Sequence, residues 1–211
     1  MNSTLDIKQA RELVRDKRLW PLVNRFLFAF APLVDDERVA ASAGPTTAAL
    51  RGCARVDAFV LKQLNVEPIF HTFPASDGSR LLLLNDSVYL EIGLWLAALA
   101  DAKTLRRTIS KAKVQELKVQ LPNVYPEVLR LYPYFHKWKL PICGEAYDIA
   151  GLRLLATALK HLPAALMERQ KLRFPKRLED GFTPLEETLD WELVKRLLQL
   201  HFPEEYAICC L

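Results

Sequence analysis

The chain has 211 residues and a formal net charge of +4, and 51% of its residues are hydrophobic against 26% that are charged. This composition excludes a disordered chain, and the length allows one large domain or two small ones. Surface scaling predicts that folding buries roughly 70% of the accessible surface, so a core can form without disulfides or metals.

The cysteines and the apolar runs indicate in which cellular compartment the protein is expected. The four cysteines form no CxxC pair and show no metal-ligand spacing, which favours a reducing cytosol. The N-terminus is charged and amphipathic, unlike a secretory leader. The longest apolar runs, residues 26–34 and 92–100, are much shorter than the about 20 residues that a membrane span needs. We therefore expect a cytoplasmic protein without a membrane-inserted segment.

Short helices are predicted along the first 80 residues, because apolar residues recur at intervals of three and four. The predicted segments are residues 5–18, a second helix from Pro21 to Phe30, and a third from Thr46 or Thr47 to Leu64. Residues 69–84 contain an Asp-Gly pair between two apolar runs, and two alternatives stay open for them, a small β-hairpin or a plain loop.

The buried centre of the fold is expected at residues 86–100. This segment is apolar nearly all round, and Glu91 is the only charge within residues 88–99. A helix without a polar face belongs inside a protein or a membrane. It is too short to span a bilayer, so we expect it in the core, capped by Asn85 or Asp86.

Positive charge is concentrated directly after this helix. Residues 101–121 carry six basic and two acidic side chains, a local excess of +4 that equals the net charge of the whole chain. Such a segment could bind phosphate, an acidic lipid surface or an acidic protein, and a solvated helix face is the simpler alternative. The candidate partner-binding residues are Lys103, Arg106, Arg107, Lys111, Lys113 and Lys118.

The basic segment is predicted to form two helices. In one continuous helix, Leu105 and Ile109 would lie roughly opposite Val114, Leu117 and Leu121. Two short helices, Ala102–Ile109 and Lys111–Gln120, give each half its own apolar stripe. Asp101 and Ser110 would cap them.

The C-terminal half is also predicted to be helical. A helix ending near Pro133 is followed by an aromatic cluster, and further helices are expected over residues 144–163 and 164–174. Thr183 to Glu186 form a capping box with proline at the first helical position, which predicts that the last helix starts there. The whole pattern predicts an all-α fold, a single globular domain of roughly nine short helices. Residues 1–80 could pack as a separate lobe beside a helical core of residues 81–211.

A search for catalytic chemistry yields no candidate residue, metal site or cofactor site. The chain contains no GxGxxG, GxxxxGK[ST], GxSxG or HExxH motif, and its four histidines are scattered. Acidic pairs such as Asp35-Asp36 are more typical of a helix N-terminus or a solvated face. We therefore expect a protein that is not an enzyme.

A helical nucleic-acid-binding module that uses residues 101–121 remains the alternative. The aromatic side chains expected among the cations of a single-strand binder are absent from this segment. No helix-turn-helix with a polar recognition helix is evident either. A protein partner is therefore favoured.

From Leu81 onward, over about 130 residues, the order of features resembles the SctK-type accessory proteins of bacterial type III secretion systems. The matching pieces are a leucine-rich lead-in, LEIGLWLAAL, TLRRTISKAKVQEL, GLRLLATALKHLPAALMERQKLRFP and LVKRLLQLHFP. Residues 1–80 match less clearly. The resemblance implies an all-α fold and a structural role without catalytic residues.

The resemblance also implies the partners. Proteins of this family are cytoplasmic sorting-platform subunits that join the inner-membrane ring protein, through its SctD-like cytoplasmic domain, to the SctQ-like pod or C-ring protein. The chain would then be a scaffold peripheral to the inner membrane, in a virulence-associated protein-transport apparatus. By analogy, Arg106 and Arg107 with their lysine neighbours become candidates for a protein contact.

Overall fold

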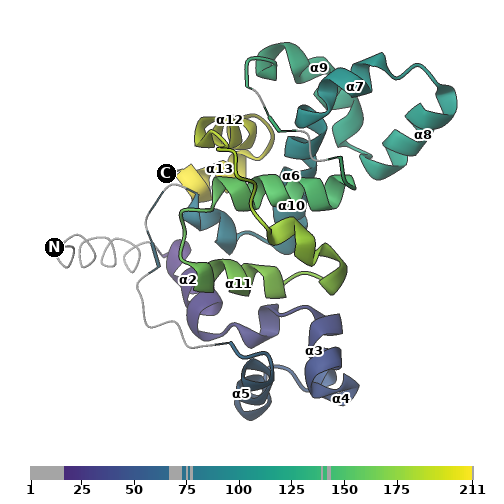
Figure 1. The fold of residues 1–211 in the computed structure, drawn as a ribbon. Coiled ribbons are helices and arrows are strands. Elements are labelled where there is room, and N and C mark those ends of the chain that lie inside the picture. The colour runs from purple at the N-terminus through teal and green to yellow at the C-terminus, as the bar shows by residue number, and fades with distance from the viewer. Residues whose placement is uncertain are drawn as a thin grey trace. The chain divides into compact units, whose positions relative to one another are not determined.

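The computed structural model describes residues 17–66, 73, 74, 76, 78–138, 140, 141 and 144–210. These residues form twelve α-helices and three 3-10 helices, and no strand occurs among them (Figure 1). The predicted all-α class is confirmed. The chain divides into two compact units, which are described separately below. The first comprises Met1–Leu83 and Leu162–Arg177, and the second comprises Leu84–His161 and Leu178–Leu211.

The first unit combines the N-terminal helices with one helix from much later in the chain. Its elements are α2 (Leu19–Phe28), η1 (Ala31–Leu33), α3 (Asp36–Ala43), α4 (Pro45–Ala49), α5 (Ala54–Gln63), η2 (Ser79–Leu83) and α11 (Ala164–Leu172). Phe26 lies at its centre, with edge-on ring contacts to Phe30 at 5.7 Å and to Phe73 at 6.2 Å. All three phenylalanines are buried, so aromatic packing forms the core of this unit.

Two buried arginines of the α11 segment hold it to the rest of the first unit. Arg169 is 4% exposed and donates hydrogen bonds to the carbonyl oxygens of Phe26 (2.9 Å) and Leu27 (2.7 Å), in the last turn of α2. Arg173 donates to the carbonyl oxygen of Leu82 at 2.6 Å. Carbonyls in the last helical turn have no partner within their own helix and carry partial negative charge, so a guanidinium stabilises them.

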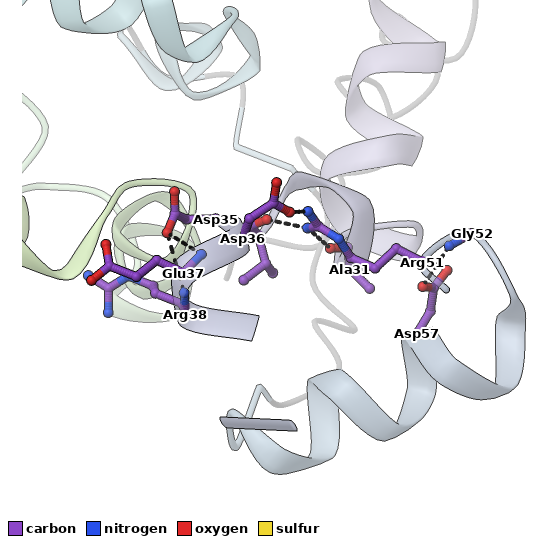
Figure 2. A network of polar contacts seen from close by, with 9 residues as sticks. Ala31, Asp35, Asp36, Glu37, Arg38, Arg51, Gly52 and Asp57 are labelled. Atoms are coloured by element: carbon purple, nitrogen blue, oxygen red, sulfur yellow. Dashed lines mark hydrogen bonds and ion pairs between the residues drawn. The ribbon is translucent and has the colours of Figure 1, made fainter. Parts of the chain in front are cut away.

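A second polar network fixes the turns around α3 (Figure 2). The Asp35 carboxylate accepts hydrogen bonds from the backbone N–H groups of Glu37 and Arg38 and thereby caps α3. Arg51 pairs with Asp36 and donates to the Val34 carbonyl oxygen. One side chain from the loop after α4 thus joins the end of η1 to the start of α3.

Two N-terminal predictions differ from the structure. The single helix expected from Thr46 or Thr47 to Leu64 is wrong, because Gly52 adopts φ +93° and separates α4 from α5. The alternative hairpin is also wrong in its second half, since the segment beginning at Ser79 forms the 3-10 helix η2. Residues 69–72 of the first hairpin strand, and most of the helix expected at 5–18, lie outside the described residues.

The second unit is built around two helices that cross at their midpoints. Its elements are α6 (Asp86–Ala100), α7 (Ala102–Arg107), α8 (Lys111–Gln120), α9 (Val124–Phe135), α10 (Tyr147–Ala158), α12 (Trp191–His201) and α13 (Pro203–Cys210). The 3-10 helix η3 (Lys176–Phe182) begins in the first unit and ends in the second. α6 and α10 pack directly on one another (Figure 1). The prediction of a buried helix from Asp86 is confirmed, with Ile92 and Leu96 fully buried.

Two C-terminal helix boundaries differ from the predictions. The last long helix does not start at Thr183, because residues 183–190 form an irregular segment and α12 begins at Trp191. Asp190 supplies the N-cap instead, accepting a hydrogen bond from Glu192 N at 2.9 Å. α9 also continues past Pro133 to Phe135. No helix within the described ranges has both the length and the apolar character required to cross a bilayer.

Candidate docking surface

The basic segment forms two short helices, as predicted, and each is anchored by few side chains. α7 ends at Arg107 and α8 begins at Lys111. In α7, Ala102 and Leu105 are buried, and Leu117 is the buried residue of α8. Apart from the half-buried Val114, the other residues of both helices are exposed, so a small apolar anchor holds a large charged surface in place.

All six predicted cations lie on this exposed face, which we call the basic surface: Lys103, Arg106, Arg107, Lys111, Lys113 and Lys118. None of the six forms an ion pair with another described residue. The guanidinium of Arg106 lies over the ring of Tyr132 in α9, 4.8 Å from its centroid. This cation–π contact fixes one charge of the basic surface on the neighbouring helix.

The predicted apolar role of Ile109 is wrong. α7 stops two residues earlier, and the flanking residues Thr108 and Ser110 are extended, so Ile109 leaves the face of Leu105 and is 95% exposed. Val119 is also exposed, at 73%. Val119 was not predicted as a surface residue, although Leu117 two positions earlier already occupies the buried face. Two uncovered apolar side chains therefore lie among the cations, as in many protein-binding surfaces.

The start of α7 is held by a tertiary hydrogen bond. Asp101 is the residue before α7, as predicted, but its carboxylate makes no capping bond. It accepts a hydrogen bond from the Tyr147 hydroxyl of α10 at 2.8 Å instead. The pKa of Tyr147 is raised well above its usual range. Burial is the largest cause, and the hydrogen bond to Asp101 is the second. The bond ties the basic surface to the central helix pair.

A cavity of about 250 Å³ lies beside this hydrogen bond. Its walls are mostly small residues, and its polar groups are Asp101, Tyr147 and Glu145. Glu145 is paired with Arg153 at 2.7 Å. The cavity thus offers a carboxylate and a phenol that already bond each other, without a nucleophile beside a base. Across the described ranges, no three potential ligands among His, Cys, Asp and Glu are grouped to hold a metal.

Comparison with known proteins identifies no family for this chain. No protein-family model, no curated protein and no solved structure matches the chain.

Proposed function

We propose that this protein is a non-enzymatic structural adaptor that binds an acidic protein surface through its basic surface. The observation that carries the proposal is that six exposed cations, none paired within the described residues, are mounted on two packed helices. Long-range attraction steers an acidic partner towards such a surface, and the fixed geometry selects among partners. Ile109 and Val119 add uncovered apolar area at the same place.

The cellular role proposed is that of a sorting-platform subunit in a bacterial type III secretion system. The support is the resemblance of residues 81–211 to SctK-type proteins, together with the confirmed all-helical fold. In this role the chain would link the SctD-like cytoplasmic domain of the inner-membrane ring protein to the SctQ-like pod protein. Its location would be cytoplasmic, peripheral to the inner membrane.

A pull-down with charge-reversed variants tests both levels of the proposal. The surface variant carries Arg106→Glu, Arg107→Glu and Lys111→Glu. The control carries the same change in charge at exposed residues of the first unit, Arg25, Arg55 and Lys62. Because each rim charge contributes roughly 0.2–1 kcal/mol, reversing three should weaken capture of the ring or pod protein by roughly 0.6–3 kcal/mol, which is about threefold to about 150-fold. Circular dichroism of both variants checks that the helices remain intact.

The outcomes separate the proposed function from its alternatives. Equal capture by the wild type and the surface variant contradicts the docking role. Loss of capture in both variants contradicts a specific role for the basic surface. Binding to duplex DNA that falls steeply between 50 and 200 mM salt, measured by fluorescence anisotropy, would favour the nucleic-acid module instead.

A further inference from the structure

The second unit carries an acidic segment that is the electrostatic counterpart of the basic surface. Residues 178–194 contain six acidic side chains and no lysine or arginine. Five of the six are exposed. The acidic residues are Glu179, Asp180, Glu186, Glu187, Asp190 and Glu192.

The acidic segment is held in a defined position although part of it has no regular secondary structure. The backbone N–H of Leu185 donates to the hydroxyl oxygen of Thr157 in α10 at 2.9 Å. Lys160 donates to the backbone carbonyl oxygen of Glu187 at 3.0 Å, and Arg153 donates to that of Asp180 at 3.1 Å. These bonds engage backbone atoms, and the side chains of Glu186 and Glu187 stay exposed, so the segment is preformed for binding.

Apolar side chains accompany the carboxylates. Leu185, Leu189 and Trp191 are each half-buried and alternate with the acidic residues. The basic surface shows the same combination, with exposed Ile109 and Val119 among its cations. The two surfaces are therefore opposite in charge, and both carry partly uncovered apolar groups. This is the composition expected of two sides of one interface.

The two surfaces do not neutralise each other within one molecule. Cations that bond the acidic segment include Arg153 and Lys160, through its backbone carbonyls, and Lys195, which lies 3.5 Å from Glu192. Among the described residues, no ion pair joins any of the six cations of the basic surface to the acidic segment. Both surfaces thus remain available to another molecule.

We infer that the basic surface binds the acidic segment of a second copy of this chain. The contact is heterologous, because one copy contributes α7–α8 and the other contributes residues 178–194. The first copy keeps its acidic segment unused and the second keeps its basic surface unused, so the contact can repeat head to tail. It is weakened by salt, because most of its charges lie at an exposed rim.

This inference rests on the proposed function, which makes the basic surface a docking site. It adds a second copy of the chain as a ligand of that surface. Self-association and partner binding would then compete for the same cations. The two ideas fail separately, because self-association is measured on the purified protein alone. A basic-surface variant that stays monomeric yet still captures the ring and pod proteins would contradict the proposed function and leave this inference standing.

A charge-swap experiment tests the inference. One double variant carries Arg106→Glu and Arg107→Glu, the other carries Glu186→Lys and Glu187→Lys, and Arg55→Glu with Lys62→Glu serves as the control. Multi-angle light scattering at low salt should give the wild type and the control a mass that rises with protein concentration above the 24.1 kDa of one chain. At a salt concentration tenfold higher, both should be monomeric.

Each of the first two double variants should be monomeric at low salt, whereas their equimolar mixture should regain a concentration-dependent mass. In the mixture, the reversed basic surface of the first variant can bind the reversed acidic segment of the second. The two unchanged surfaces can bind each other as in the wild type. A wild type that is monomeric at low salt and high concentration overturns the inference. Self-association that both double variants retain, or a mixture that stays monomeric, overturns it as well.

Discussion

Gly93 and Gly151 face each other where α6 crosses α10. A Cβ atom added to Gly93 would lie 3.0 Å from the Gly151 carbonyl carbon. One added to Gly151 would overlap the Gly93 carbonyl group and lie 2.9 Å from its Cα. The two backbones are therefore in direct contact, and the close packing of α6 on α10 depends on the absence of two side chains.

Replacing Gly151 by alanine should destabilise the second unit. The added methyl group must displace backbone atoms, and overpacking of this kind costs about 1–3 kcal/mol, which outweighs a gain in helix propensity of about 1 kcal/mol. Gly93→Ala should cost less, because its clash is milder. Urea titration followed by circular dichroism measures both free energies of unfolding. An unchanged or raised stability of Gly151→Ala would show that the helices can separate without loss.

Replacing Arg169 by methionine should destabilise the first unit by about 2–4 kcal/mol. The change removes two charge-assisted hydrogen bonds to the carbonyls of Phe26 and Leu27 and leaves these carbonyls with fewer partners. Lys62→Met in α5 of the same unit is the control. Lys62 is exposed and forms no ion pair with another described residue, so the expected cost is below about 0.5 kcal/mol. Similar losses of stability in the two variants would contradict a special role for Arg169.

His201 should make the stability of the second unit depend on pH. Its ring stacks on that of Trp95, with the two centroids 4.1 Å apart. Burial is the largest influence on the pKa of His201 and lowers it. Glu127 raises this pKa and Arg130 lowers it, both by less than burial does. Because the folded-state pKa lies below the unfolded value, the unfolded state binds the proton first. Stability is therefore fully present above about pH 6.5 and is lost as the pH falls through the folded-state pKa.

The test compares urea titrations at pH 7 and pH 5. His201→Gln should show a smaller drop in the free energy of unfolding than the wild type. Replacement of the exposed His136 by glutamine should leave the wild-type drop unchanged. If His201→Gln loses as much stability on acidification as the wild type, other groups account for the pH dependence.

Tyr147 should remain un-ionised in the folded protein under alkaline conditions that ionise ordinary tyrosines. Its raised pKa follows from burial and from the Asp101 carboxylate. Below the unfolded-state pKa of about 10 its hydrogen bond contributes fully, and that contribution falls as the pH rises. At pH 11, tyrosinate absorbance near 295 nm should be equal in the wild type and Tyr147→Phe. A lower amplitude in the variant would show that Tyr147 ionises normally.

Composition and periodicity predict the elements that depend on local sequence. The apolar helix α6 needs no tertiary information, because a segment without a polar face can only be buried. The division of the basic segment follows from the angular mismatch between Leu105 and Leu117 in one helix. The six cations were also placed correctly on the exterior, since nothing local could bury them.

The features that sequence did not reveal depend on contacts between distant residues. Arg169 and Arg173 looked like part of an ordinary charged stretch, and their burial depends on carbonyl groups of α2 and η2. The capping box at Thr183 is a sound local signal, but hydrogen bonds to Thr157 and Lys160 hold that segment in a non-helical form. Tertiary partners prevailed over local propensity at both places.

The place of α11 in the first unit has a consequence for how the chain is made. Arg169 and Arg173 complete a core that includes Phe26, which is translated more than a hundred residues earlier. At about 5–20 residues per second, synthesis from Leu83 to Arg177 takes roughly 5–19 s. During that interval the emerging chain displays an unfinished aromatic cluster outside the ribosome. The nascent protein is thus a candidate chaperone client, and any fragment that stops before α11 inherits the same exposed surface.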